Sequence, residues 1–173
     1  MYISVDVESD GPIPYDYSMI CFGAVLLDRD LNITKTFYGQ LQPISDKYIP
    51  EALAVSGFSR EETLLFPEPI KTMTDFLNWI KSNCGDTQVR FFSDNVGYDW
   101  QFINWYFHHF LGNNPFGWSS INIKNLYNGI ERNMRRSHKY LRTTKHTHHP
   151  VDDAMGNAEA VVKMIKNFGL RMF

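Results

Sequence analysis

Apolar residues dominate three stretches within the first 41 residues, and short polar turns separate these stretches. Residues 2–7 alternate between apolar and polar positions, residues 17–27 are almost continuously apolar, and residues 33–41 follow the polar turn DRDLN. Alternation indicates a half-buried strand, whereas an unbroken apolar run bounded by turns indicates a buried one. The sequence therefore predicts three consecutive strands, arranged as an antiparallel meander.

Helical spacing replaces this pattern after Pro43 and Pro50, which open a helical section. Before Gly85, apolar residues recur at the i, i+3, i+4, i+7 spacing of one helix face: Met73, Phe76, Leu77 and Ile80. Residues 88–92 predict a short strand and residues 97–111 and 123–130 predict two helices. The segment after residue 149 predicts a last helix with one apolar face, formed by Ala154, Ala158, Val161 and Ile165. This order predicts one α/β domain over residues 1–173, in which helices flank a mixed sheet with antiparallel N-terminal strands.

Composition supports a globular protein that acts away from membranes. Hydrophobic residues make up 43% of the chain and aromatic residues 15%, which is enough for a substantial core. The longest apolar run, residues 19–27, is far shorter than the roughly 20 residues that span a bilayer, and the N-terminus lacks the basic region of a signal peptide. The two cysteines, Cys21 and Cys84, show no metal-ligand spacing. We therefore expect a cytoplasmic protein with unpaired thiols.

Charge is divided unevenly along the chain. The net charge is −2, but residues 1–110 carry a balance of −8 and residues 111–173 a balance of +6. Six basic residues fall within one stretch of fourteen: Arg132, Arg135, Arg136, Lys139, Arg142 and Lys145. Two interpretations remain open for this basic stretch, a solvated loop and an arm that contacts phosphates.

Four acidic residues stand at junctions between predicted elements. Asp6 and Glu8 end the first strand, Asp99 lies in the first turn of a helix that follows a strand, and Asp153 starts the last helix. Because side chains alternate along a strand, Asp6 and Glu8 lie on one face. Taken singly, each is also typical of a turn or of a helix N-terminus. Together they predict a site for hard divalent ions such as Mg²⁺ or Mn²⁺, which bind oxygen ligands.

Three ordered motifs carry a family resemblance. Residues 2–11 read YISVDVESDG, residues 95–99 read NVGYD, and residues 148–153 read HHPVDD, followed by an apolar helix. This set, spread over nearly the whole chain, resembles the DEDDh 3′–5′ exonuclease superfamily, which includes RNase T, oligoribonuclease and the proofreading subunit of bacterial DNA polymerase III. Each motif is weak alone, and the ordered set is specific.

The resemblance implies an RNase H-like fold and two bound divalent ions. On that basis Asp6 would bridge both ions, Glu8 and Asp153 would complete the first, and Asp99 would support the second. His148 would act as general base on the attacking water, a role that suits an imidazole near neutral pH. The expected product is a nucleoside 5′-monophosphate.

The sequence departs from the family pattern at two places. Many relatives carry a segment resembling His-Gly-Ile-Thr between the first two motifs, where residues 55–59 read VSGFS, with serine in place of histidine. In the third motif, His149 stands four residues before Asp153, the spacing at which a sister class places a tyrosine. Family spacing selects His148 as the catalytic residue.

Further residues near the motifs are candidates to contact the substrate. They are Gly11 of the first motif and three aromatic residues that could stack on terminal bases, Phe58, Tyr98 and Trp100. Aromatic residues beside a motif are also often part of the core.

We expect a metal-dependent 3′–5′ exonuclease that acts on the 3′ ends of single-stranded nucleic acid. A catalytically silent binding module and a phosphohydrolase of mononucleotides are the alternatives. The intact carboxylate set disfavours the first, and the basic stretch disfavours the second, because a mononucleotide needs no such track. The choice between RNA and DNA stays open. The size of the chain, which is similar to that of RNase T and oligoribonuclease, makes a homodimer an expectation.

Overall fold

A five-stranded mixed sheet forms the centre of the molecule. The structure is a computed structural model that describes residues 1–33 and 35–172; residue 34, within the predicted third strand, and residue 173 lie outside the described residues. The strands are β1 (Tyr2–Ser9), β2 (Met19–Leu27), β3 (Lys35–Gln40), β4 (Arg90–Ser93) and β5 (Ser120–Asn122), in the order β3-β2-β1-β4-β5. Strands β1, β2 and β3 pair antiparallel, whereas β4 is parallel to both β1 and β5. The predicted mixed sheet with antiparallel N-terminal strands is confirmed.

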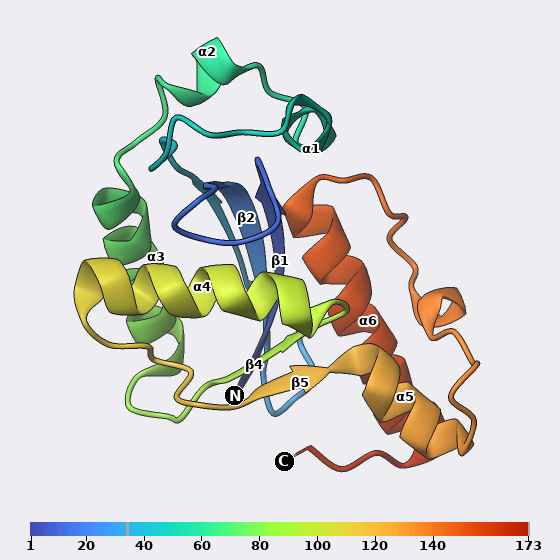
Figure 1. The fold of residues 1–173 in the computed structure, drawn as a ribbon. Coiled ribbons are helices and arrows are strands. Elements are labelled where there is room, and N and C mark those ends of the chain that lie inside the picture. Colours follow the sequence, from blue (N-terminus) through green and yellow to red (C-terminus); the bar gives the residue numbers. More distant parts are fainter. Residues whose placement is uncertain (34, 173) are drawn as a thin grey trace.

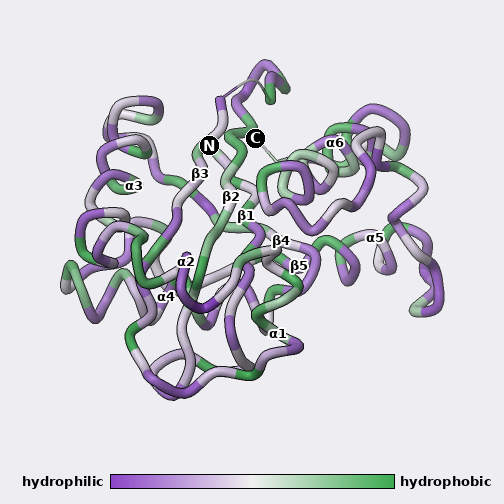
Figure 2. Tube along the Cα trace, turned by 90° about the horizontal axis from the view of Figure 1, so that it is seen from above, coloured by the Kyte–Doolittle hydropathy of each residue, from purple (hydrophilic) through white to green (hydrophobic). Residues whose placement is uncertain are grey.

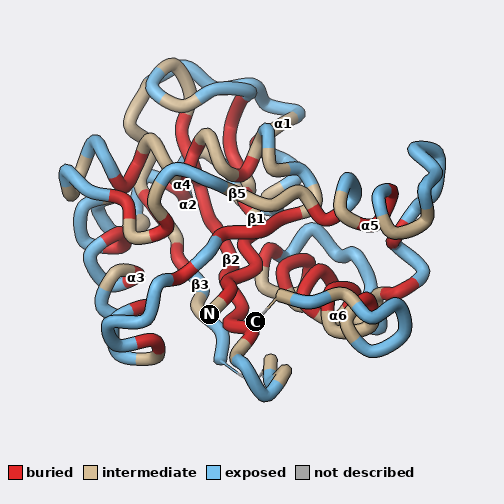
Figure 3. Tube along the Cα trace, turned by 90° about the horizontal axis from the view of Figure 1, so that it is seen from below, coloured by how far each residue is buried: buried red, intermediate tan, exposed pale blue. Residues whose placement is uncertain are grey.

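Helices cover both faces of this sheet (Figure 1). On one face, Ile3 and Val5 of β1 belong to a core with helices α3 (Pro69–Cys84) and α4 (Val96–Leu111). On the other face, Tyr2 packs with helices α5 (Ile123–Glu131) and α6 (Pro150–Phe168). Successive side chains of β1 thus pack into two different cores, one on each face of the sheet. Figures 2 and 3 show the apolar, buried strands between the two groups of helices.

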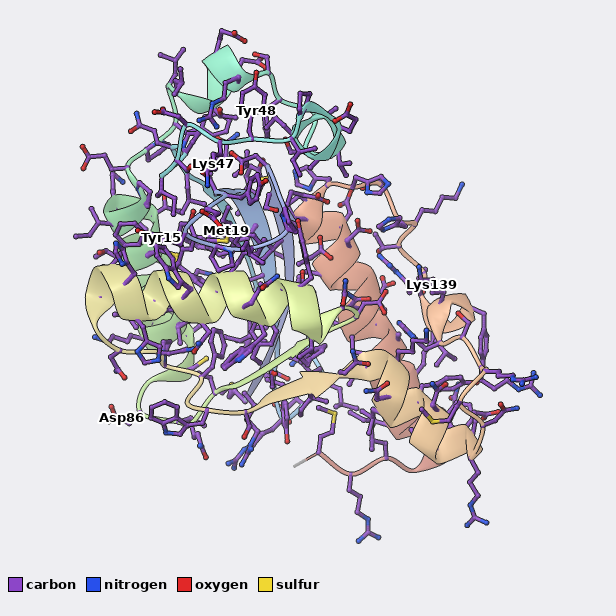
Figure 4. The ribbon with its side chains drawn as sticks, in the orientation of Figure 1. Tyr15, Met19, Lys47, Tyr48, Asp86 and Lys139 are labelled. Atoms are coloured by element: carbon purple, nitrogen blue, oxygen red, sulfur yellow. The ribbon has the colours of Figure 1, made fainter. Side chains whose placement is uncertain are left out.

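A lobe formed by residues 43–66 lies over the carboxyl end of β1 (Figure 1). It contains the short helices α1 (Pro50–Val55) and α2 (Arg60–Thr63). Arg60 fastens it to the sheet through an ion pair of 2.9 Å with Asp10, whose side chain is fully buried. The guanidinium also lies 5.0 Å from the centre of the Tyr48 ring, within the lobe (Figure 4). This ion pair, together with the hydrogen bond from the Ile49 amide to the Asp10 carbonyl at 2.8 Å, holds the lobe above the end of β1.

The structure corrects several boundaries of the predicted elements. The second strand begins at Met19 and not at residue 17, because the Tyr17 amide donates to the Ile13 carbonyl in a turn. Strand β4 ends one residue later than predicted, at Ser93. Strand β5 and the 3₁₀ helix η1 (Lys139–Leu141) were not predicted, since three residues are too few to show a periodicity.

Two further findings concern thiols and membranes. Cys21 and Cys84 are both free and buried. None of the helices in the described part of the chain combines the length and the apolar character that a membrane crossing requires.

Gly23 allows helix α6 to lie directly against the sheet. This residue pairs with Asp6 across the β1–β2 ladder. A Cβ atom at position 23 would lie 2.3 Å from the carbonyl carbon of Pro150 and 2.3 Å from the nitrogen of Val151. Such a distance is far inside van der Waals contact. The absence of a side chain therefore sets how close the first turn of α6 comes to Asp6.

We expect Gly23→Ala to push the start of α6 away from β2 and to lower the free energy of unfolding by about 1–3 kcal/mol, the usual cost of overpacking. Gly129→Ala in α5 is the matched control, because a Cβ there meets nothing within 4 Å. That control should be neutral or stabilising by up to about 1 kcal/mol. Denaturant melts of both variants test this, and an unchanged midpoint for Gly23→Ala would contradict the close approach.

Candidate active site

Three carboxylates meet at the carboxyl end of β1. Asp6 and Glu8 project from the same face of the strand, as their spacing predicts, and Asp153 comes from the first turn of α6. One oxygen from each lies within 4.8 Å of the others. Carboxylate oxygens at this separation form a donor set that suits a hard divalent cation.

Asp99 reaches the same region from the first turn of α4. Strand β1 is longer than β4, whose pairing with it covers only Tyr2, Ile3 and Ser4. Beyond that pairing, the Val7 amide donates to Asp99 Oδ1 at 3.1 Å. Asp99 is itself buried, and this hydrogen bond ties the end of β1 to the first turn of α4.

The carboxylates raise one another's pKa values. Burial, followed by the charges of Asp99, Asp153 and Glu8, raises the pKa of Asp6 well above its ordinary value. Burial and the charges of Asp153 and Asp99 raise the pKa of Glu8 to about 7. Burial also raises the pKa of Asp99 to about 7, although the hydrogen bond from the Val7 amide opposes this. The surrounding protein groups thus leave part of the negative charge uncompensated. A bound divalent cation would neutralise it.

Asp153 is held by a buried arginine. Arg142 Nη2 lies 2.7 Å from Asp153 Oδ1, and the arginine side chain is only 6% exposed. Gly156 provides the space, since a Cβ at that position would lie 2.3 Å from Arg142 Nε. Arg142 was expected to guide the substrate along the surface, but the structure places it inside, where it orients a carboxylate.

The two adjacent histidines of the third motif point to different places. His148 has a positive φ of 62°, and its Nδ1 lies 4.0 Å from Glu8 Oε1. The His149 ring instead lies 5.0 Å from the Tyr38 ring on β3. Of the two, His148 therefore faces the carboxylates.

A third histidine, His146, joins this group although no motif marked it. Its Nδ1 lies 2.7 Å from Asp153 Oδ1, and its ring centre lies 4.3 Å from that of His148. The only signal in the sequence is the spacing of two residues between His146 and His148, which is common in polar loops.

A cavity of about 260 Å³ opens beside Glu8. Its lining consists of Glu8, Ser9, Ala52, Val55, Asn95 and Tyr98. Tyr98 was among the expected substrate contacts, and its hydroxyl contacts that of Ser9. Ala52 and Val55 come from α1 in the lobe, so the lobe forms one wall of this cavity.

Three other expected substrate contacts are not part of the lining of this cavity. Gly11 packs against the Tyr17 ring, which occupies the space of any side chain at position 11. Phe58 lies edge-on to Phe66, with 4.9 Å between ring centres. Trp100 packs against Phe91 and belongs to the core.

Part of the basic stretch surrounds a second cavity, of about 480 Å³. The residues that line it are Asp94, Asn95, Asn122, Lys124, Arg135, Arg136, Ser137, His138 and Lys139. Lys139 stands on η1 (Figure 4), and Lys124 from the first turn of α5 lines the same cavity. Arg132 and Lys145 are exposed but lie outside this lining. Because Asn95 lines both cavities, the basic cavity is a neighbour of the one beside Glu8.

Comparison with known proteins decides the family. A scan against protein-family profiles found no match. The chain is 36% identical over 171 residues to a curated Escherichia coli protein, the 3′–5′ DNA exonuclease Cap18, and the match covers 96% of this chain and 90% of that protein. The chain belongs to the DEDDh-class 3′–5′ exonucleases. It is accordingly a hydrolase that acts on nucleic acid.

Solved structures share the fold of this exonuclease. The nuclease domain of 3′hExo, a DEDDh family member bound to rAMP, superposes with a TM-score of 0.78 at 18% identity, covering 99% of this chain and 95% of that one. Cell-death related nuclease 4 (CRN-4) gives 0.77 at 17% identity, covering 95% and 63%. Exonuclease I from E. coli, in complex with a dA16 oligonucleotide, gives 0.73 at 15% identity, covering 96% and 41%. The expected RNase H-like fold is confirmed.

The raised carboxyl pKa values predict how the stability of the metal-free exonuclease depends on pH. Glu8 and Asp99 titrate near pH 7 in the folded state and near their ordinary values of 4.5 and 3.8 when unfolded. The folded state therefore binds more protons in between, and its stability falls as pH rises through this window. We expect the melting temperature in EDTA to fall from about pH 5 to about pH 8.

Two comparisons make this measurement decisive. Glu8→Gln should flatten the pH dependence, because it removes one of the titrating groups. Mg²⁺ should raise the melting temperature more at the higher pH, where the carboxylates are charged. A melting temperature in EDTA that rises across this range would contradict the repulsion between the carboxylates.

Proposed function

We propose that the exonuclease removes nucleotides from the 3′ ends of single-stranded DNA, using two divalent ions, Mg²⁺ or Mn²⁺, and releasing nucleoside 5′-monophosphates. The observation that carries this proposal is the convergence of Asp6, Glu8 and Asp153 within 4.8 Å, with His148 beside them. The choice of DNA is supported by the name of the relative with 36% identity. The whole of residues 1–173 would act as one exonuclease domain.

The carboxylates would divide between two ions. Asp6, Glu8 and Asp153 would hold one ion, since their oxygens lie within 4.8 Å of one another, and Asp6 with Asp99 would hold the other, since the charge of Asp99 acts on Asp6. When bound, such ions neutralise the phosphodiester and acidify a water molecule. Arg142 keeps the carboxylate of Asp153 turned toward Asp6 and Glu8, and Gly23 keeps the first turn of α6 close to β1.

His148 would take the proton from the attacking water. It projects from the residue pair that precedes α6, its side chain is 55% exposed, and it faces Glu8. An exposed imidazole can pass the proton on to solvent, and imidazoles exchange protons near neutral pH.

The substrate strand would run from the cavity beside Glu8 toward the basic cavity. The first cavity has apolar walls from Ala52 and Val55 and the ring of Tyr98, which suit a terminal nucleoside. The second offers several cations to the phosphates upstream. Asn95, at the boundary, would lie under the strand.

A gel assay that shows the direction of degradation tests the function. Single-stranded DNA and RNA of one sequence, labelled at the 5′ end, should be shortened stepwise in Mg²⁺ or Mn²⁺ and left intact in EDTA, with DNA degraded faster. Asp6→Asn should abolish hydrolysis because it removes a charge that both ions need. Its melting temperature in EDTA should stay the same or rise. Metal-independent cleavage, or turnover by Asp6→Asn near that of the wild type, would refute the two-ion assignment, and faster RNA cleavage would refute the choice of DNA.

The two histidines at the start of α6 provide a separate test. His148→Ala should lower turnover by about 10²–10⁴-fold, the usual contribution of a general base. His149→Ala should change it little, because that ring packs on Tyr38. Steady-state rates at saturating substrate distinguish the two, and a larger loss at position 149 would move the catalytic role there.

The basic cavity predicts a dependence on strand length. In an Asp6→Asn background, replacing Arg135, Arg136 and Lys139 by Gln should weaken the binding of long strands and flatten its salt slope by about 0.7 per lost phosphate contact. In an otherwise wild-type background, dinucleotide hydrolysis should change much less. Arg132→Gln is the control, because this exposed residue lies outside the cavity lining. An unchanged slope in the triple variant would identify the stretch as an ordinary charged loop.

A homodimer and a cytoplasmic location stay predictions. The catalytically silent module is not proposed further, because the carboxylate set is complete and the chain belongs to an exonuclease class.

A further inference from the structure

We propose that His146, His148 and Asp153 form a Zn²⁺ site, and that a zinc ion bound there inhibits the exonuclease by withdrawing His148 and Asp153 from hydrolysis. The binding of the ion is independent of the proposed mechanism, whereas the inhibition rests on it. His146 has no part in the proposed reaction, so this site gives it a function.

The three side chains are already close enough to share an ion. One donor atom from each lies within 4.8 Å of the others, and His146 Nδ1 lies 2.7 Å from Asp153 Oδ1. Zinc–nitrogen and zinc–oxygen bonds of about 2.0–2.2 Å place the donors of a tetrahedron roughly 3.3–3.6 Å apart. This spacing lies between the 2.7 Å of the His146–Asp153 contact and the 4.8 Å limit for the three donors. Because the histidine side chains are 49% and 55% exposed, they can rotate into place.

The carboxylate of Asp153 can serve the ion without losing its arginine. Arg142 and His146 both contact Oδ1, whereas the hydrogen bond recorded for Oδ2 comes from the His148 amide at 3.1 Å. Once the His146 ring binds the ion instead of contacting Oδ1, that oxygen has a lone pair for the ion while Arg142 stays in place. A fourth ligand is at hand in Glu8, whose Oε1 lies 4.0 Å from His148 Nδ1. Water is the alternative, as in open zinc sites with three protein ligands.

The loop that carries both histidines is fastened before His146 and again between His146 and His148. Before His146, the amides of Thr143 and Thr144 each donate to Glu159 Oε2 at 2.7 Å. Between the two histidines, the Thr147 hydroxyl donates to Asp152 Oδ2 at 3.0 Å. These contacts reduce the conformational entropy that ion binding would cost.

The donor types favour zinc over the catalytic ions. Two imidazole nitrogens suit Zn²⁺, whereas Mg²⁺ prefers oxygen ligands and retains several waters. An excess of Mg²⁺ therefore leaves the two imidazoles free, and Zn²⁺ competes with it for Asp153, which both sites share. A zinc ion at this site would bind the His148 ring, which faces Glu8, and the carboxylate of Asp153, which lies near Asp6.

Calorimetric titration of Zn²⁺ in saturating Mg²⁺, without nucleic acid, tests the site directly. Removing even an indirect partner of a metal usually costs about 10–100-fold in affinity, so His146→Ala should weaken zinc binding by at least about 10-fold. His149→Ala is the matched control, because it removes a neighbouring imidazole that packs on Tyr38, and its zinc affinity should equal that of the wild type. Co²⁺ should give the visible absorption of a four-coordinate site in the wild type and lose it in His146→Ala.

Inhibition is measured on the same variants. The zinc concentration that halves hydrolysis of labelled DNA in saturating Mg²⁺ should rise by at least about 10-fold in His146→Ala and stay unchanged in His149→Ala. His146→Asn, which keeps a donor to Asp153, repeats the test if the alanine variant unfolds. Wild-type affinity in both His146 variants, or equal losses at positions 146 and 149, would overturn the proposal. Since calorimetry needs no substrate, failure of the exonuclease assignment leaves that result interpretable.

Discussion

Repulsion between carboxylates is the constraint around which this molecule is arranged. Asp6, Glu8, Asp99 and Asp153 come from β1, α4 and α6, and burial makes their mutual repulsion stronger than it would be in water. Nothing in the local propensity of these segments brings such groups together. The packing of two helices against one strand does so, and the cores on both faces of the sheet supply the free energy that opposes the repulsion.

Several small features convert this packing into a defined geometry. Strand β1 continues past the end of its pairing with β4, so the Val7 amide can donate a hydrogen bond to Asp99. Gly23 removes the side chain that would separate α6 from the sheet, and Gly156 makes room for Arg142 against Asp153. Each feature acts on the distance or orientation of one carboxylate. The site therefore depends on backbone approach and on missing side chains as much as on the acidic residues themselves.

The sequence predicted the carboxylates because their positions follow from local rules. Asp6 and Glu8 share a face through the period of a strand, and Asp153 sits where a helix begins. The burial of Arg142 could not be predicted, because it depends on Gly156, fourteen positions later and in another element. The contact of His146 with Asp153 depends in the same way on a loop closing back onto α6. Strand β5 could not be predicted, because three residues show no periodicity and because its partner strand, β4, is distant in the sequence.

The way in which the lobe of residues 43–66 is attached bears on how such an enzyme diversifies. The lobe contributes Ala52 and Val55 to the cavity beside Glu8 but supplies none of the carboxylates. Its buried anchor, Arg60 on Asp10, lies apart from the three clustered carboxylates. Changes in length or composition within this segment can thus accumulate without disturbing the hydrolytic centre. Under the proposed function, exchange of this one piece of chain would alter the walls around the terminal nucleoside while the carboxylates stay under separate selection.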